Sequence, residues 1–307
     1  MAGADPKDPA GQSVVPMTNS RNYRGRFAPS PTGPLHFGSL VTALASYLEA
    51  KSCEGQWLVR IEDLDPLREP PEATGEILNS LDAHGLFSDE PVLFQSRRHE
   101  AYHSAIEHLL SEGAAYRCSC SRKQLQANNG RHPRHCRNSN AAISNQPSAI
   151  RFALNDEQCQ WQDQLLGLQH HRVRAEIDDP VLRRKEGFFA YQLAVVVDDI
   201  EQGITDVVRG SDLLDMTAQQ LQIYHALTAT PPRWLHVPVI VNDQGQKLSK
   251  QSHAPALNNG SPVNNLFEAL SALGQQPPQS LLTGSVDAIL EWARTHWRRG
   301  AIHLTDR

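Results

Sequence analysis

Four residues that can ligate a metal lie within one short polar stretch of this chain. The spacing is Cys-x-Cys, then eleven residues to a histidine and three more to a cysteine, at Cys118, Cys120, His132 and Cys136. Three thiolates and one imidazole are the donor set of a closed tetrahedral zinc site, and a bound metal would supply folding free energy that this stretch lacks. The pattern therefore predicts one structural Zn²⁺ site. His135 is a second candidate for the fourth ligand, and unrelated reduced cysteines are the alternative explanation.

Two other segments contain residues suited to binding phosphate. In residues 29–40, PSPTGPLHFGSL, His36 and Gly38 stand where a strand is expected to give way to a helix. Free backbone N–H groups, the helix dipole and a side-chain donor would meet an anion there. In residues 247–250, KLSK, Lys247 and Lys250 bracket a serine and can neutralise a triphosphate or a leaving pyrophosphate. Taken singly, each segment is more simply explained as an ordinary exposed turn.

Charged residues also stand among apolar strand residues. Arg26 and Arg209 have such neighbours, and a buried guanidinium is costly unless it meets a carboxylate, which a substrate can provide. Glu62 follows the apolar residues 57–61 and can serve as a fixed anion. The alternative for Glu62 and Arg209 is an internal salt bridge between strand ends.

The first half of the chain alternates strand and helix patterns. Residues 24–28 predict a strand, residues 29–34 a loop, and the apolar spacing from Leu40 to Leu48 a helix. A second strand is expected over 57–61, followed by helices over 77–86 and 102–110. This order is typical of βαβ units in an α/β fold with a parallel sheet, in which the first strand-to-helix turn forms the usual ligand crevice.

The second half begins with residues 116–148, which lack apolar periodicity and cannot bury a core of their own. Beyond them we expect strands over 150–154, 188–197, 204–208 and 236–242, a helix after Asp212, and a mainly helical tail. In that tail, the tryptophans and arginines at helical spacing favour a packed amphipathic helix over an RNA contact; they are Trp292, Arg294, Trp297, Arg298 and Arg299.

Composition limits the class of protein. The 307 residues are 39% hydrophobic and 21% charged, which is typical of globular chains. The longest apolar runs have five residues, too few to span a membrane. Residues 1–22 resemble a disordered leader rather than a secretory signal, so we expect a cytoplasmic protein with reduced cysteines. The net charge is −5, yet residues 116–137 hold six Lys and Arg and no acid, which favours RNA as a partner.

The two phosphate-binding segments, in this order and spacing, resemble the signature sequences of class I aminoacyl-tRNA synthetases, where both flank ATP. Together with VRIEDLD (59–65), FFAYQLAVVVDD (188–199) and VVRGSDLL (207–214), they resemble the catalytic domain of glutamyl-tRNA synthetases. Only 57 residues follow Lys250, too few for the anticodon-binding region of those enzymes. The chain is therefore most similar to their truncated relatives, the glutamyl-queuosine tRNA(Asp) synthetases.

The resemblance implies a Rossmann-like catalytic domain in two parts, residues 23–113 and 151–256. Between them would lie a zinc-stapled insertion over 114–150, and after them a short helical segment over 257–307. The implied activity is ATP-dependent formation of glutamyl-adenylate from L-glutamate without tRNA. Transfer of the glutamyl group to the queuosine base in the anticodon of tRNA(Asp) would follow. We expect neither a membrane nor a protein partner.

The resemblance also assigns site residues. His36 and Lys250 would be catalytic, and ATP with Mg²⁺ would be bound by His36, Gly38, Ser39, Lys247 and Lys250. Glutamate would be bound by Arg26, Ala28, Ser30, Glu62, Tyr191 and Arg209. In the zinc site of the truncated relatives a tyrosine usually stands where this chain has His132, so the fourth ligand is where this sequence departs from the pattern.

Three other functions are compatible with the same motifs. The first is that of a glutamyl-tRNA synthetase that charges the 3′ end of tRNA. The second is that of an amino-acid:ATP ligase acting on a small molecule or protein. The third is a synthetase-like binding module without catalysis, against which the intact His36 and Lys250 argue.

Overall fold

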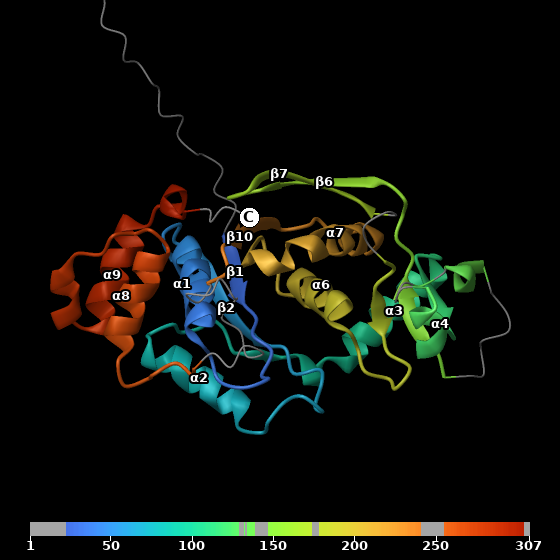
Figure 1. Cartoon of the computed structure of the whole chain (residues 1–307), viewed down its shortest axis with the longest axis horizontal. Coiled ribbons are helices and arrows are strands. Elements are labelled where there is room, and N and C mark those ends of the chain that lie inside the picture. The colour runs from blue at the N-terminus through green and yellow to red at the C-terminus, as the bar shows by residue number, and fades with distance from the viewer. Residues whose placement is uncertain are drawn as a thin grey trace, which may run out of the picture.

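The computed structural model describes residues 23–128, 132, 134–138, 147–173, 178–240 and 255–303. Figure 1 shows these parts along one long axis. The C-terminal helices lie at one end, the parallel strands near the middle, and the region around α4 (Arg122–Gln126) at the other end. Among the described residues, no helix combines the length and the apolar character needed to cross a bilayer. The predicted α/β architecture is confirmed.

The first parallel sheet has the order β1-β2-β3, with β1 (Arg24–Phe27), β2 (Gln56–Ile61) and β3 (Leu93–Phe94). Helix α1 (Phe37–Lys51) makes the crossover from β1 to β2 and packs Leu40, Leu44 and Leu48 into the core. Helices α2 (Ala73–Ala83) and α3 (His99–Ser111) follow. Gly85 ends α2 with φ +67°, and a Cβ there would approach Leu290 and Val286 to 2.9 Å. The predicted βαβ unit is therefore present, with its turn between β1 and α1.

The second sheet has the order β7-β6-β10-β9. The strands β9 (Asp206–Gly210), β10 (Arg233–Val237) and β6 (Gln158–Asp163) are parallel, and β7 (Gly167–Arg172) pairs antiparallel with β6. The second sheet contacts the first through a hydrogen bond of 2.9 Å from the Thr205 N–H to the Arg24 carbonyl. The 3₁₀ helix η3 (Ser211–Met216) and helix α7 (Thr217–Ala226) follow β9, as the sequence predicts. The strand expected over 236–242 is shifted: β10 begins at Arg233 and ends at Val237, residues 238–240 are not in a strand, and residues 241 and 242 lie outside the described part.

One predicted strand is wrong. Residues 188–197 were expected in a sheet, but Tyr191–Glu201 form helix α6. Nearly every residue of this helix from Leu193 to Asp199 is buried, so both faces are apolar and the helical period is hidden in the sequence. A short apolar run fits a buried strand and a buried helix equally well; here the eleven-residue length identifies the helix.

The stretch around the cysteines contains a third, antiparallel sheet in the order β4-β5-β8, with β4 (Ala115–Cys118), β5 (Ala149–Phe152) and β8 (Val181–Arg183). The short 3₁₀ helix η2 (His135–Asn138) packs beside it. Its apolar cluster is small, and three of its five buried residues are cysteines. The cluster consists of Tyr116, Cys118, Cys120, Cys136 and Ala149. This agrees with the expectation that the stretch cannot form a substantial core alone.

The C-terminal segment is helical, as predicted, and packs on α1. It comprises α8 (Pro262–Ala272), η5 (Gln279–Thr283), α9 (Val286–His296) and η6 (Arg299–Ala301), with α8 beside α1 (Figure 1). Glu49 of α1 is buried and accepts hydrogen bonds from Trp297 Nε1 at 2.8 Å and Arg299 Nε at 3.0 Å. This contact joins the tail to the first βαβ unit, so Trp297 and Arg299 have a structural role.

We expect Arg299→Met to lower the free energy of unfolding by about 2 kcal/mol, because the buried Glu49 carboxylate would retain only the Trp297 donor. The partial exposure of Arg299 makes this less than the cost for a fully buried pair. Urea denaturation followed by tryptophan fluorescence measures the change. Arg294→Met is the matched control, since Arg294 is exposed and pairs only with Glu291 of its own helix. Equal losses in the two variants would contradict the docking role.

Candidate active site and metal cluster

A group of buried charges lies where β1 and β2 end. Arg26 of β1 donates from Nε to Asp199 Oδ1 at 3.0 Å, and Arg60 of β2 donates to the same oxygen at 2.7 Å. Asp199 comes from α6 and is 3% exposed. Burial alone would raise the pKa of Asp199, but Arg26 and Arg60 outweigh it and hold that pKa below its usual value. One carboxylate thus fixes two guanidinium groups from neighbouring strands.

Glu62 follows β2 directly and belongs to the same group. Its Oε1 lies 3.6 Å from the nearer Arg60 nitrogen and accepts no hydrogen bond, although the residue is only 6% exposed. Burial raises the pKa of Glu62 to about 7, against the opposing charges of Arg60 and Arg26. A buried carboxylate oxygen without a donor is costly, and a cationic ligand would relieve that cost.

Arg209 of β9 is buried without a carboxylate partner among the described residues. Its guanidinium donates to four neutral acceptors: His236 Nε2 at 3.0 Å, Gln220 Oε1 at 2.7 Å, Thr217 Oγ1 at 2.8 Å and the Tyr191 hydroxyl at 3.5 Å. Burial lowers the pKa of Arg209. Of the two residues for which an internal salt bridge was the alternative, Glu62 lies 3.6 Å from Arg60, whereas Arg209 pairs with no acid among the described residues, so its positive charge is left for another anion.

The acceptor at His236 is itself held in place. His236 Nδ1 lies 2.6 Å from Asp163 Oδ2, and neither side chain is exposed. Burial lowers the pKa of His236, although the hydrogen bond to Asp163 opposes that effect, so the ring is neutral near pH 7. The proton then lies on Nδ1, facing Asp163, and the Nε2 lone pair faces Arg209. Asp163 therefore selects the tautomer that orients Arg209.

Three of these charged residues, Arg26, Glu62 and Arg209, line a cavity of about 400 Å³. It lies at the carboxyl ends of parallel strands, the usual place for a ligand in such a sheet. The structure brings together here all of the residues that the resemblance assigned to glutamate: Arg26, Ala28, Ser30, Glu62, Tyr191 and Arg209. Thr42 of α1 completes one wall, and Leu213 and Met216 of η3 another.

The predicted phosphate-binding residues lie at the N-terminus of α1. His36 is the N-cap, its Nδ1 accepting from the Ser39 N–H at 3.2 Å, and Gly38 lies in the first turn. Lys247 and Lys250 lie outside the described residues, so their place near ATP stays a prediction. The chain is described again from residue 255, and there Ala256 forms an antiparallel bridge with His36 while Leu257 N–H donates to the Leu35 carbonyl at 2.8 Å.

The four predicted metal ligands are also brought together. The candidate ligand atoms of Cys118, Cys120, His132 and Cys136 all lie within 4.8 Å of one another, and all four residues are buried. Cys120 Sγ is 3.4 Å from His132 Nε2 and 3.6 Å from Cys136 Sγ. Burial, together with the neighbouring thiols of Cys136 and Cys118, raises the pKa of Cys120 to about 12. A divalent cation would reverse that penalty by ionising the thiols, so the donor set fits one structural metal site.

His135, the other candidate ligand, lies at the edge of this cluster. Its Nε2 is 3.6 Å from Cys120 Sγ, but the residue is exposed, whereas His132 is buried among the thiols. The geometry favours His132.

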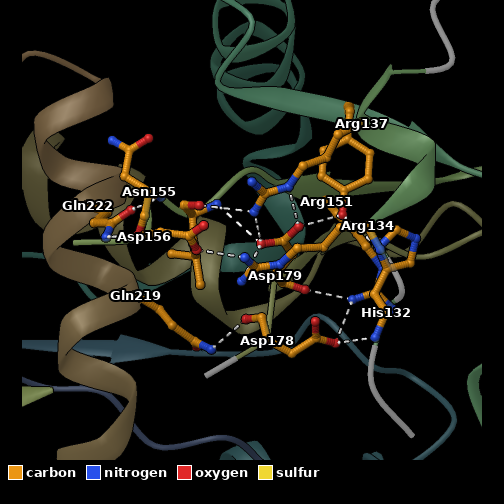
Figure 2. Close-up of polar contacts among 12 residues, drawn as sticks. His132, Arg134, Arg137, Arg151, Asn155, Asp156, Asp178, Asp179, Gln219 and Gln222 are labelled. Atoms are coloured by element: carbon orange, nitrogen blue, oxygen red, sulfur yellow. Dashed lines mark hydrogen bonds and ion pairs between the residues drawn. The ribbon is translucent and has the colours of Figure 1, made fainter. Parts of the chain in front are cut away.

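Figure 2 shows polar contacts that hold His132 in place. The His132 backbone N–H donates to Asp178 Oδ2 at 2.9 Å, and His132 Nδ1 lies 3.0 Å from the hydroxyl of Tyr116, which donates to Asp179 Oδ2 at 2.6 Å. Asp178 also accepts, through its backbone carbonyl, a hydrogen bond of 3.2 Å from Gln219 of α7. Such outer contacts orient a metal-binding histidine, and here they join the cluster to the helix beside the cavity.

The same close-up corrects one expectation about RNA. Arg134 pairs with Asp156 at 2.7 Å, and Arg137 pairs with Asp179, so both are used within the fold (Figure 2). Of the six basic residues in 116–137, those that the structure leaves exposed are Arg117, Arg122 and Lys123, while Arg131 lies outside the described residues. The basic surface is therefore smaller than the sequence suggests.

Comparison with known proteins shows the family of the chain. Residues 22–280 match the family model described as tRNA synthetases class I (E and Q), catalytic domain. The chain belongs to this family.

Relatives and solved structures agree with that class I assignment. The chain is 45% identical over 279 residues to a glutamyl-Q tRNA(Asp) synthetase of Vibrio vulnificus, covering 91% of both chains. It is 46% identical over 288 residues to a glutamyl-Q tRNA(Asp) synthetase of Pseudomonas fluorescens, covering 94% of this chain and 96% of the relative. A glutamate tRNA ligase from Elizabethkingia meningosepticum, solved in complex with its amino acid, superposes with a TM-score of 0.77 at 26% identity. That match covers 92% of this chain and 66% of the ligase chain.

Several residues that shape this synthetase site were not predicted. Asp199 and Asp163 pair with positive or polar partners from other elements, and no local spacing reveals such pairs. His236 was read only as part of a strand. One signal was available: two acids, Asp198 and Asp199, end an otherwise apolar run, and buried acids require partners.

We expect His132→Ala to lose the bound metal and to lower the melting temperature, since a buried ligand of the cluster would be missing. His135→Ala should retain metal and melt as the parent protein does, because His135 lies at the exposed edge. Elemental mass spectrometry of protein purified without chelator measures zinc per chain, with Cys118→Ser as the positive control for loss. Metal loss in the His135 variant and retention in the His132 variant would reassign the ligand.

Proposed function

We propose that this protein is a glutamyl-Q tRNA(Asp) synthetase. It activates L-glutamate with ATP in the absence of tRNA and transfers the glutamyl group to the queuosine base in the anticodon of tRNA(Asp). The carrying observation is the 400 Å³ cavity, whose walls include all six residues assigned to glutamate. Relatives of this name match more than 90% of the chain. ATP and tRNA as substrates place the reaction in the cytoplasm.

The charges of the cavity support glutamate as the amino acid. Arg209 has neutral partners on its guanidinium, so a ligand carboxylate would gain a charge-assisted hydrogen bond that an amide would not equal. Glu62 has an oxygen without a donor and would accept from the ligand ammonium. A site that leaves buried charges unpaired when the wrong ligand binds discriminates strongly against it.

In the first step, an oxygen of the glutamate α-carboxylate attacks the α-phosphorus of ATP, and the bond to pyrophosphate breaks. His36 and the N-terminus of α1 would hold phosphate oxygens. Lys250 precedes Ala256 by six residues, and Ala256 pairs with His36, which supports a place for Lys247 and Lys250 on the same phosphates. Mg²⁺ bound with ATP would neutralise phosphate charge.

In the second step, a hydroxyl oxygen of the queuosine base attacks the acyl carbon of glutamyl-adenylate. The bond from that carbon to the phosphate oxygen breaks, AMP leaves, and the proton of the hydroxyl is released to water. No protein nucleophile takes part, so the rate depends on positioning and on stabilising charge. The cluster of Cys118, Cys120, His132 and Cys136 would hold Zn²⁺ in a structural role, because all four donors are protein side chains and leave no open position.

The decisive assay combines pyrophosphate exchange with transfer of labelled glutamate. We expect exchange with glutamate and ATP alone, and label on tRNA(Asp) that carries queuosine but not on tRNA(Asp) that carries guanosine. His36→Ala should reduce exchange about 100-fold or more, as for loss of one donor to developing charge. Label at the 3′-terminal ribose would instead indicate a glutamyl-tRNA synthetase, and no activity under any condition would indicate a binding module.

A pH dependence follows from Glu62. Its pKa is raised to about 7 by burial, so the carboxylate is ionised above pH 7 and becomes protonated below it. The protonated form cannot pair with the ligand ammonium, so the KM for glutamate in pyrophosphate exchange should rise about tenfold per pH unit below 7 and level off above it. Glu62→Gln should have a high KM with no such inflection. The same inflection in that variant would assign the titration to another group.

A further inference from the structure

A second cavity, of about 600 Å³, adjoins the glutamate cavity. The two share part of their walls, formed by Ser30, Glu62, Tyr191 and Met216. The second cavity extends from there between the loop after β2, which carries Asp65, and the segment between β8 and α6, which carries Arg184. We propose that this cavity binds the acceptor nucleotide of the RNA, with Asp65 and Glu69 facing the amine and diol of its modified base. This inference rests on the proposed function.

The first argument is the position of the second cavity next to the glutamate cavity. The acyl carbon of the adenylate must lie in the glutamate cavity, and the attacking hydroxyl must reach it from an adjoining space. The phosphate-binding side is set by α1, whose Thr42 lines the first cavity and not the second. His36 and Gly38 line neither cavity, so the phosphates would lie beyond the first cavity, on the side of α1. Of the two cavities, the second is therefore the one left for the acceptor once amino acid and ATP are placed.

The shared wall between the cavities is a second argument. Glu62 is buried and lines both cavities, as Ser30, Tyr191 and Met216 also do. The Glu62 Oε1 that lacks a donor is assigned above to the ammonium of glutamate, so the second cavity begins at a residue that holds the amino acid. A hydroxyl bound in the second cavity would therefore lie beside the glutamyl group that it attacks.

The charges on the far wall match a nucleotide of this kind. Asp65 Oδ2 accepts from Arg68 Nε at 2.8 Å and from Arg184 at 3.1 Å, and Glu69 Oε1 accepts from the Asp65 N–H at 2.9 Å. The queuosine base carries a cyclopentenediol on a secondary amine that is protonated near neutral pH, and carboxylates suit both groups.

The two arginines suit the rest of the nucleotide. The side chains of Arg68 and Arg184 are 67% and 46% exposed, so their guanidinium groups reach the rim of the cavity, where a phosphate would lie. Leu64, Val181 and Phe189 give the cavity apolar surface for the base. The modified nucleotide has an ammonium, hydroxyls, a base and a phosphate, and the carboxylates, apolar side chains and guanidinium groups of the cavity match them.

The test separates the acceptor step from activation. The variants are Asp65→Asn and Glu69→Gln, which keep side-chain shape, and the matched control is Glu76→Gln, an exposed residue of α2 outside both cavity linings. We expect the KM for queuosine-containing tRNA(Asp) to rise about tenfold or more in both variants, as for loss of a charge-assisted hydrogen bond. Pyrophosphate exchange should stay within about twofold of the parent, and the control should match the parent in both assays.

Free queuosine nucleoside provides a second measurement. It should inhibit transfer competitively with tRNA, and Glu69→Gln should weaken that inhibition by the same factor as it raises KM. An unchanged KM and unchanged inhibition in the variants would place the acceptor elsewhere, with the proposed function intact. An equal fall of exchange and transfer would make the second cavity part of the activation site. A parent protein that exchanges pyrophosphate but transfers nothing to queuosine would overturn the proposed function itself.

Discussion

The buried ion pairs of Asp199 with Arg26 and Arg60 are the constraint on which the site depends. They join α6 to β1 and β2, so the helix, both strands and the residues that follow them are fixed relative to one another. Burying three charges is favourable only when each is paired with good geometry, and removal of Asp199 would leave Arg26 without a counter-ion and Arg60 with only Glu62, at 3.6 Å. Glu62 lies next to this group, and its Oε1 accepts no hydrogen bond.

Arg209 is held in a different way. Its partners are neutral, so its charge is oriented without being cancelled, and the residue that makes this possible is Asp163, which fixes the tautomer of His236. Orientation of a ligand-binding arginine by neutral acceptors keeps its affinity for an anion. The cavity therefore has one positive and one negative group with capacity left for a ligand, and an amino acid with a second carboxylate satisfies both.

Much of this could be predicted from the sequence, because the informative signals are local. The turn between β1 and α1 and the cysteine spacing each depend on neighbouring residues. The errors have one cause: contacts between distant segments. The sequence predicts a strand over residues 188–197, which is wrong because the surfaces that bury both faces of α6 come from elsewhere in the chain. Arg134 and Arg137 were read as free cations because their acids lie after the insertion, at Asp156 and Asp179.

These distant contacts also show that the metal cluster and the cavity are parts of one polar network. From His132 the hydrogen bonds run through Asp178 to Gln219, and Gln192 then joins Gln219 at 2.6 Å and Gln220 at 3.0 Å. Gln220 ends the series by accepting from Arg209 at 2.7 Å. Each amide has a fixed direction, because its donor and acceptor are both engaged along this path, so reversing one would break bonds on both sides. The polar insertion thus does more than cover the end of the molecule: it contacts α7 through Gln219, and hydrogen bonds link Gln219 through Gln192 to Gln220, which holds the buried guanidinium of Arg209.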